Sequence, residues 1–206
     1  MLMTALLSNL RNTVIAGFVL AGIVFLIYLQ VQGYDPTLFW PFLVRWLHVV
    51  CGIMWIGLLW YFNFVSTPTA PKIPDELKPA LGKYITPAAL FWFRWGAMGT
   101  IFFGLILAYL NDYLVQALTI DSVENFTVPK SIVIGIGMWL GIIMWFNVWF
   151  IIWPNQQKAL NIGGKYPDIA PDQKAAAGKT AGQFSRVNTL LSIPMLFCMV
   201  SAQNLF

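Results

Sequence analysis

Long apolar runs alternate with short polar stretches along the whole sequence. Five of the runs are long enough to cross a bilayer, at about residues 14–32, 39–65, 88–110, 131–153 and 183–204. A helix of about 20 predominantly apolar residues spans the hydrocarbon core. The pattern therefore predicts an all-α integral membrane protein, a bundle of five transmembrane helices that forms a single membrane domain, 1–206.

The polar stretches differ in charge, and this difference predicts the orientation of the chain. Stretches 66–87 and 154–182 contain three and four lysines, whereas 111–129 carries Asp112, Asp121 and Glu124. Loops rich in lysine and arginine stay on the cytoplasmic side. We therefore expect the N-terminus in the cytoplasm and the C-terminus outside.

The composition agrees with a membrane protein and argues against a soluble one. The chain is 59% hydrophobic and 10% charged, whereas soluble domains carry roughly 25% charged residues. The net charge is +4, but the basic residues cluster in two loops and form no single patch, so no nucleic-acid partner is expected. Arg11 precedes the first apolar run, but that run is long and has no small-x-small cleavage site, so we interpret it as a retained helix and not a signal peptide.

The second apolar run holds the only histidine of the chain, His48, and an arginine one helical turn earlier, Arg45. Ionisable residues inside a membrane span are costly and mark candidate functional sites. Gly52 follows His48 at the spacing that places both on one helix face. His48 fits equally well as a structural residue bonded to a neighbouring helix and as an axial ligand of b-type haem.

In the haem interpretation, Gly52 gives the porphyrin room and Arg45 meets a propionate. A second axial ligand would be a methionine, would come from another subunit, or would be absent. The methionines considered are Met98, Met138 and Met199. The sequence contains no CxxCH motif and no zinc-ligand spacing, so no covalent haem c is expected.

Polar residues also recur toward the predicted cytoplasmic ends of the helices. Two guanidinium groups and three carboxamides at one depth suit a planar, polar anion. The two arginines could instead extend to the lipid headgroups. The residues of this predicted inner layer are Asn63, Arg94, Asn147, Arg186 and Asn188.

Several motifs resemble the membrane domain of the bacterial urate hydroxylase family, also called the urate oxidase N-terminal domain. They cover about residues 39–200 and occur in the same order as in the family. The motifs are Arg45-Trp-Leu-His48, Tyr84-Ile-Thr-Pro-Ala-Ala-Leu-Phe-Trp-Phe-Arg94, Phe146-Asn-Val-Trp-Phe-Ile-Ile-Trp-Pro-Asn155 and Ser185-Arg-Val-Asn188.

The resemblance implies an oxidoreductase of purine catabolism in a bacterial inner membrane, which oxidises urate and passes electrons to the respiratory chain. Longer relatives carry a C-terminal cytochrome c. This sequence has no haem-c motif, so a separate cytochrome c or respiratory partner is expected. A looser likeness, of Leu-His followed by Gly and Trp, links the second run to small haem-associated membrane proteins, including the copper-resistance D type.

Two other functions stay open from the sequence alone. The chain could be a non-catalytic membrane subunit or homo-oligomeric scaffold of a larger complex, which would bind no chromophore. It could also transport a purine anion, although five helices without a visible repeat fit known transporter designs poorly. A haem spectrum separates the first function from the redox protein, and urate uptake into liposomes tests the second.

Overall fold

The computed structural model describes residues 6–206 and divides into two compact units, Met1–Trp40 and Pro41–Phe206. Within the described residues, five helical segments are long and apolar enough to cross a membrane, which confirms the predicted number of candidate spans and indicates a multi-pass membrane protein. Which side each terminus faces stays a prediction. The segments are Leu10–Gln32, Pro36–Lys72, Lys78–Leu110, Pro129–Leu160 and Pro171–Asn204.

The first unit contains α2, Leu10–Gln32, and the first turn of α3, Pro36–Trp60. Asn9 caps α2 by accepting hydrogen bonds from the backbone N–H groups of Arg11 and Asn12. Gly33, with φ +78°, ends the helix in a conformation that favours glycine. Asp35 begins α3 by accepting two hydrogen bonds from Thr37, and these bonds hold the pKa of its carboxyl below the ordinary value.

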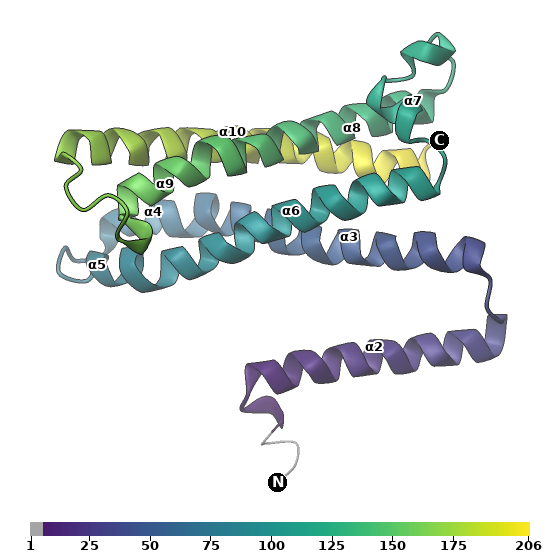
Figure 1. Ribbon diagram of the computed structural model, residues 1–206, viewed down its shortest axis with the longest axis horizontal. Helices are drawn as coiled ribbons and strands as arrows, with labels where there is room; N and C mark the ends of the chain where they lie inside the picture. Colours follow the sequence, from purple (N-terminus) through teal and green to yellow (C-terminus); the bar gives the residue numbers. More distant parts are fainter. Residues whose placement is uncertain (1–5) are drawn as a thin grey trace. The chain divides into compact units, whose positions relative to one another are not determined.

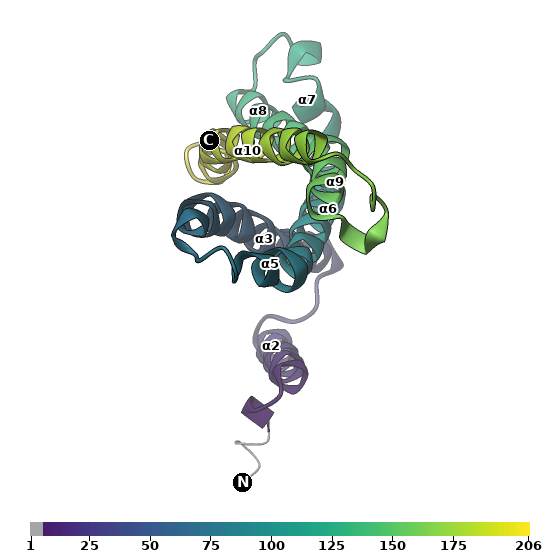
Figure 2. The same ribbon diagram turned by 90° about the vertical axis from the view of Figure 1, so that its left-hand side faces the viewer.

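The second unit contains the other long helices, shown in Figure 1. Looking along them, α3, α6, α8 and α10 lie around a common axis (Figure 2). α10 packs along α8 and α9, and α7 packs on α8. The new bounds are α6 Thr86–Leu110, α7 Leu114–Leu118, α8 Pro129–Phe146, α9 Trp153–Leu160 and α10 Pro171–Asn204.

Three π-helical segments join these helices to shorter pieces, and they explain why the helices exceed their predicted bounds. The segments are η1, Tyr61–Ser66, η3, Leu81–Ile85, and η5, Asn147–Ile152. In each case a proline stands two residues after the last π-helical residue, namely Pro68, Pro87 or Pro154. A proline ring clashes with the carbonyl four residues earlier. The wider π-helical turn relieves that clash, so the helix passes through the proline.

The predicted loops 66–87 and 154–182 are therefore wrong over much of their length. The helix that begins with α3 continues through α4, Thr67–Thr69, to η2, Ala70–Lys72. The next one begins at α5, Lys78–Ala80. Likewise α9 continues to Leu160 and α10 begins at Pro171, both within the second predicted loop. The shorter pieces η4, Ser122–Glu124, and η6, Ile162–Gly164, are single 3₁₀ turns.

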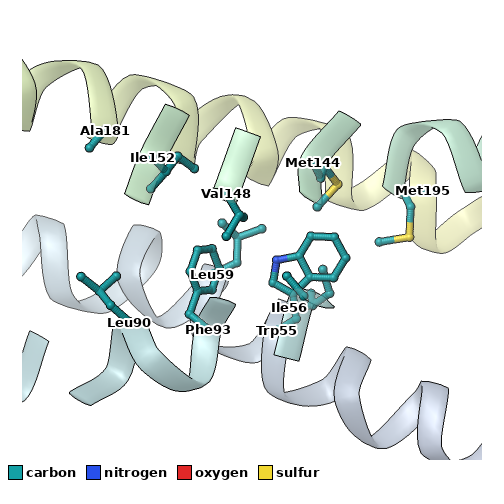
Figure 3. Packing of buried hydrophobic residues seen from close by; sticks show 11 residues of the cluster. Trp55, Ile56, Leu59, Leu90, Phe93, Met144, Val148, Ile152, Ala181 and Met195 are labelled. Carbon is teal, nitrogen blue, oxygen red and sulfur yellow. The ribbon is translucent and has the colours of Figure 1, made fainter. Parts of the chain in front are cut away.

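The main core lies midway along the second unit, where α3, α6, η5 and α10 meet (Figure 3). Trp55 and Leu59 of α3 are almost fully buried against Phe93 of α6 and Val148 of η5. A second, smaller cluster joins the ends of α6, α8 and α10 to α7, and we call this end of the unit the α7 end. Its buried members are Ala108, Ala117, Ile134, Met138 and Ala202.

Candidate functional site

Glycines of α6 bring α3 close and fix the position of His48. A Cβ atom at Gly96 would lie 3.1 Å from the backbone nitrogen of Trp55, and one at Gly104 would lie 3.0 Å from Cε1 and Nδ1 of His48. Small residues let helix backbones approach in this way. The imidazole ring therefore rests directly on the bare backbone of α6.

One hydrogen bond sets the tautomer of His48. Its Nδ1 atom lies 2.8 Å from the backbone carbonyl oxygen of Thr100. A carbonyl oxygen can only accept a hydrogen bond, so Nδ1 carries the proton and is the donor. This leaves a lone pair on Nε2. Metal-binding histidines have the same arrangement, with one ring nitrogen bonded to a carbonyl and the other on the metal.

His48 lines a partly open cavity of about 590 Å³ between α3, α6, α8 and α10. This volume is in the range of small-molecule and cofactor sites. The walls are mainly aliphatic, and Gly52, Gly104 and Gly141 contribute bare backbone to them. The nearest group to a Cβ atom at Gly52 is 4.0 Å away, so this part of the wall is open.

The two ends of the cavity differ in polarity. Toward the α7 end it is lined by Arg45 of α3, Tyr113 between α6 and α7, and Gln203 of α10. At the other end lies Trp60, whose indole N–H donates to Ser192 Oγ at 3.0 Å and so joins α3 to α10. An amphipathic ligand would therefore meet polar groups at one end only.

The structure brings together the three residues of the second apolar run that the sequence predicted as a haem site. Arg45, His48 and Gly52 all line this cavity. Of the methionines considered as a second axial ligand, Met138 and Met199 line it and Met98 does not. The sequence reasoning missed Tyr113, Gln203 and Met195, which lie far from the second apolar run and show no motif that points to it.

The inner layer is arranged in pairs. Asn147 donates to Asn188 Oδ1 at 2.9 Å, and Asn188 donates to the carbonyl oxygen of Met144 at 2.9 Å. Both side chains are buried, at 5% and 0% exposure. This pair joins α10 to α8 and η5. Buried amides are costly unless bonded, so these contacts stabilise the bundle.

Asn63 and Arg94 lie on other elements of the same layer. Asn63 donates to the carbonyl of Leu59 at 2.9 Å and to Ser185 Oγ at 2.8 Å. The guanidinium carbon of Arg94 is 3.3 Å from the ring centroid of Trp153, and its Nε atom donates to the Leu90 carbonyl at 3.3 Å. Arg186, next to Ser185 in sequence, is exposed. Joint binding of an anion by these five residues stays a prediction.

A second pocket, of about 630 Å³, lies beside α9 and the start of α10. Its lining includes Asn155, Lys158, Tyr166 and Gln173. Lys158 and Gln173 are exposed, so this is a surface hollow. Sequence reasoning did not find it. The cavity beside His48 has mainly apolar walls between four long helices, and it is the stronger candidate site.

The second part of the chain matches a known protein family. Residues 113–205 match the family model described as urate oxidase N-terminal. This part of the chain is urate oxidase N-terminal-like. No curated protein and no solved structure matches the chain.

The matched range confirms the family resemblance over somewhat less than half of the chain. It contains Tyr113, Gln203, Asn147, Arg186 and Asn188. It excludes α3, η1 and α6, which carry Arg45, His48, Asn63 and Arg94. The resemblance of residues 39–112 to the same family stays a prediction.

Proposed function

We propose that this protein is a membrane redox protein that holds b-type haem in the cavity, with His48 as an axial ligand. The observation that carries the proposal is the hydrogen bond from His48 Nδ1 to the Thr100 carbonyl. It supports ligation by Nε2, because it fixes the tautomer and the ring orientation before the ligand binds.

The residues around the cavity fit this cofactor. The aliphatic walls suit a macrocycle, the volume is that of a cofactor site, and the cationic group of Arg45 lies on the α7 side of His48. Three thioethers, of Met138, Met195 and Met199, line the same space, and thioether sulfur is a known axial ligand of haem iron. A ligand from another subunit is the alternative.

Haem, when bound, supplies a centre that accepts and gives up one electron at a time. The chain's own contributions are the imidazole ligand, apolar walls that exclude water, and the charge of Arg45. We propose that a urate-like anion or a quinol gives the electrons, and that a separate cytochrome c takes them. The family match over residues 113–205 supports a place in bacterial urate oxidation, at the inner membrane.

The first test is a reduced-minus-oxidised visible spectrum of the protein purified in mild detergent, with a pyridine haemochrome assay. We expect about one b-type haem per chain in the native protein. His48→Ala should lose most of the haem, and His48→Gly should regain it when free imidazole is added, because the added ring takes the vacated position.

Unchanged haem in His48→Ala would rule out this ligand. Absence of any chromophore in the native protein would overturn the redox proposal. The protein would then be interpreted as a scaffold subunit or homo-oligomer, which requires a stable partner complex in native membranes.

Arg94 is the residue to test for the electron donor. Its guanidinium lies over the ring of Trp153, a contact that a lysine ammonium does not reproduce. Arg94→Lys should keep the haem spectrum and lower the rate of haem reduction by urate about tenfold or more, as expected for a lost bidentate contact. The control is Arg11→Lys, at an exposed arginine of the first unit. Equal rates in both variants would exclude Arg94 from the donor site.

A further inference from the structure

Three polar side chains lie together at the α7 end of the cavity, although the sequence did not predict that they would. We infer that Arg45, Tyr113 and Gln203 form a carboxylate-binding rim, which makes an amphipathic ligand lie with its carboxylates at the α7 end and its rings toward His48. This inference rests on the proposed haem site, but it concerns recognition of the acid groups and not iron ligation.

The rim draws on three parts of the chain that are far apart in sequence. Arg45 is on α3, Tyr113 follows the end of α6, and Gln203 lies in the last turn of α10. Within residues 6–206, no hydrogen bond joins any of these three side chains to another protein group. Among the other polar groups of the lining, His48 bonds to Thr100 and Trp60 bonds to Ser192, whereas the buried indole N–H of Trp55 has no partner in the described part of the chain.

Tyr113 is held firmly by its backbone and its ring. Asp112 has φ +56°, in the left-handed region, and turns the chain sharply after α6. The Tyr113 N–H then donates to the Ala108 carbonyl at 3.2 Å, and its ring packs against the smaller core cluster at the α7 end. A ring fixed in this way loses little further freedom when its hydroxyl binds a ligand.

The protonation of Tyr113 makes it a donor. Burial raises the pKa of the phenol, and the positive charge of Arg45 opposes this as a smaller effect. Since the ordinary pKa of tyrosine is about 10, the hydroxyl is protonated at neutral pH. Arg45 and Tyr113 line the same cavity, so both can contact one ligand there.

The charge of the rim is complementary to a carboxylate. Arg45 supplies a permanent positive charge, and no aspartate or glutamate is among the residues that line the cavity. A guanidinium, a phenol and a carboxamide together offer charge-assisted and neutral donors, which are the groups that bind carboxylate oxygens. A lipid phosphate at the membrane surface could engage Arg45 in the same way, so the test must separate the two.

The experiment compares porphyrin acids with their esters on the full-length protein in detergent, prepared free of haem. Haem b and haem dimethyl ester are titrated separately, and the ratio of their dissociation constants is measured. The native protein should prefer the acid by about tenfold or more. Arg45→Gln, Tyr113→Phe and Gln203→Leu should each reduce this preference, with Arg45→Gln reducing it most.

Matched controls remove the same side-chain groups at other positions. Tyr109→Phe removes an exposed phenol, Asn204→Leu an exposed carboxamide, and Arg11→Gln an exposed guanidinium, and none of the three lines the cavity. They should leave the preference unchanged. The ratio isolates recognition of the acid groups, because a general loss of folding weakens both porphyrins equally.

The two proposals can fail separately. If haem binds through His48 but acid and ester bind equally well, the rim inference is wrong and the haem site stands; the same result would follow if Arg45 served a lipid phosphate. If the native protein binds no haem, the titration is repeated with metal-free protoporphyrin and its dimethyl ester, followed by fluorescence. A preference for the acid that Arg45→Gln removes would then support the rim without iron, and equal binding would overturn it.

Discussion

At the scale of single residues, Gly104 decides how His48 lies. A Cβ atom there would be 3.0 Å from two atoms of the imidazole, so in Gly104→Ala the ring must shift by a few tenths of an ångström, which disturbs its hydrogen bond to the Thr100 carbonyl. We expect haem content to fall several-fold in this variant. Alanine favours a helix over glycine by about 1 kcal/mol, so the loss would not come from a weaker α6.

The matched control for that substitution is Gly57→Ala. Gly57 lines the same cavity, but nothing lies within 4 Å of a Cβ atom at this position. Its haem content should stay at the native level in the pyridine haemochrome assay. If Gly104→Ala and Gly57→Ala retain equal amounts of haem, the contact of His48 with α6 does not position a haem ligand.

The same scale shows which parts of the site could be predicted from the sequence. Arg45, His48 and Gly52 share one helix face, and helical spacing was enough to group them. Tyr113 and Gln203 reach the cavity through a left-handed turn at Asp112 and through the packing of α10 on α8, and neither feature leaves a local pattern. The hydrogen bond between Asn147 and Asn188 could not be predicted either. Position along a membrane span shows which residues share a depth, but not which of them bond to each other.

At the scale of elements, the hydrophobic pattern predicted the five spans but not where their helices end. Proline and lysine in 66–87 and 154–182 indicated loops, since proline removes a backbone donor and clashes with the preceding turn. The π-helical segments η1, η3 and η5 accommodate Pro68, Pro87 and Pro154, so most of these residues are helical. Two of these segments, η1 and η5, also make tertiary contacts, Asn63 with Ser185 and Asn147 with Asn188, which no short window of sequence contains.

At the scale of the whole molecule, charge predicts which side of the membrane the cavity rim faces. The lysine-rich segments lie at the end of the second unit that carries α5 and α9, opposite the α7 end (Figure 1). The α7 end carries Asp112, Asp121 and Glu124. Because positive charge is retained in the cytoplasm, the α7 end and the rim should face outward. A cytochrome c that takes electrons from the cavity would then approach from the outside.

Cysteine labelling in intact cells tests this orientation. The background is Cys51→Ala with Cys198→Ala, since both native cysteines lie inside spans. Glu124→Cys should react with a membrane-impermeant maleimide added outside, and Lys165→Cys should react only after the cells are opened. The reverse pattern would place the rim in the cytoplasm. The electron acceptor would then have to be a cytoplasmic or quinone-type partner, because the polar end of the cavity, where charged groups of the cofactor meet the surface, would face inward.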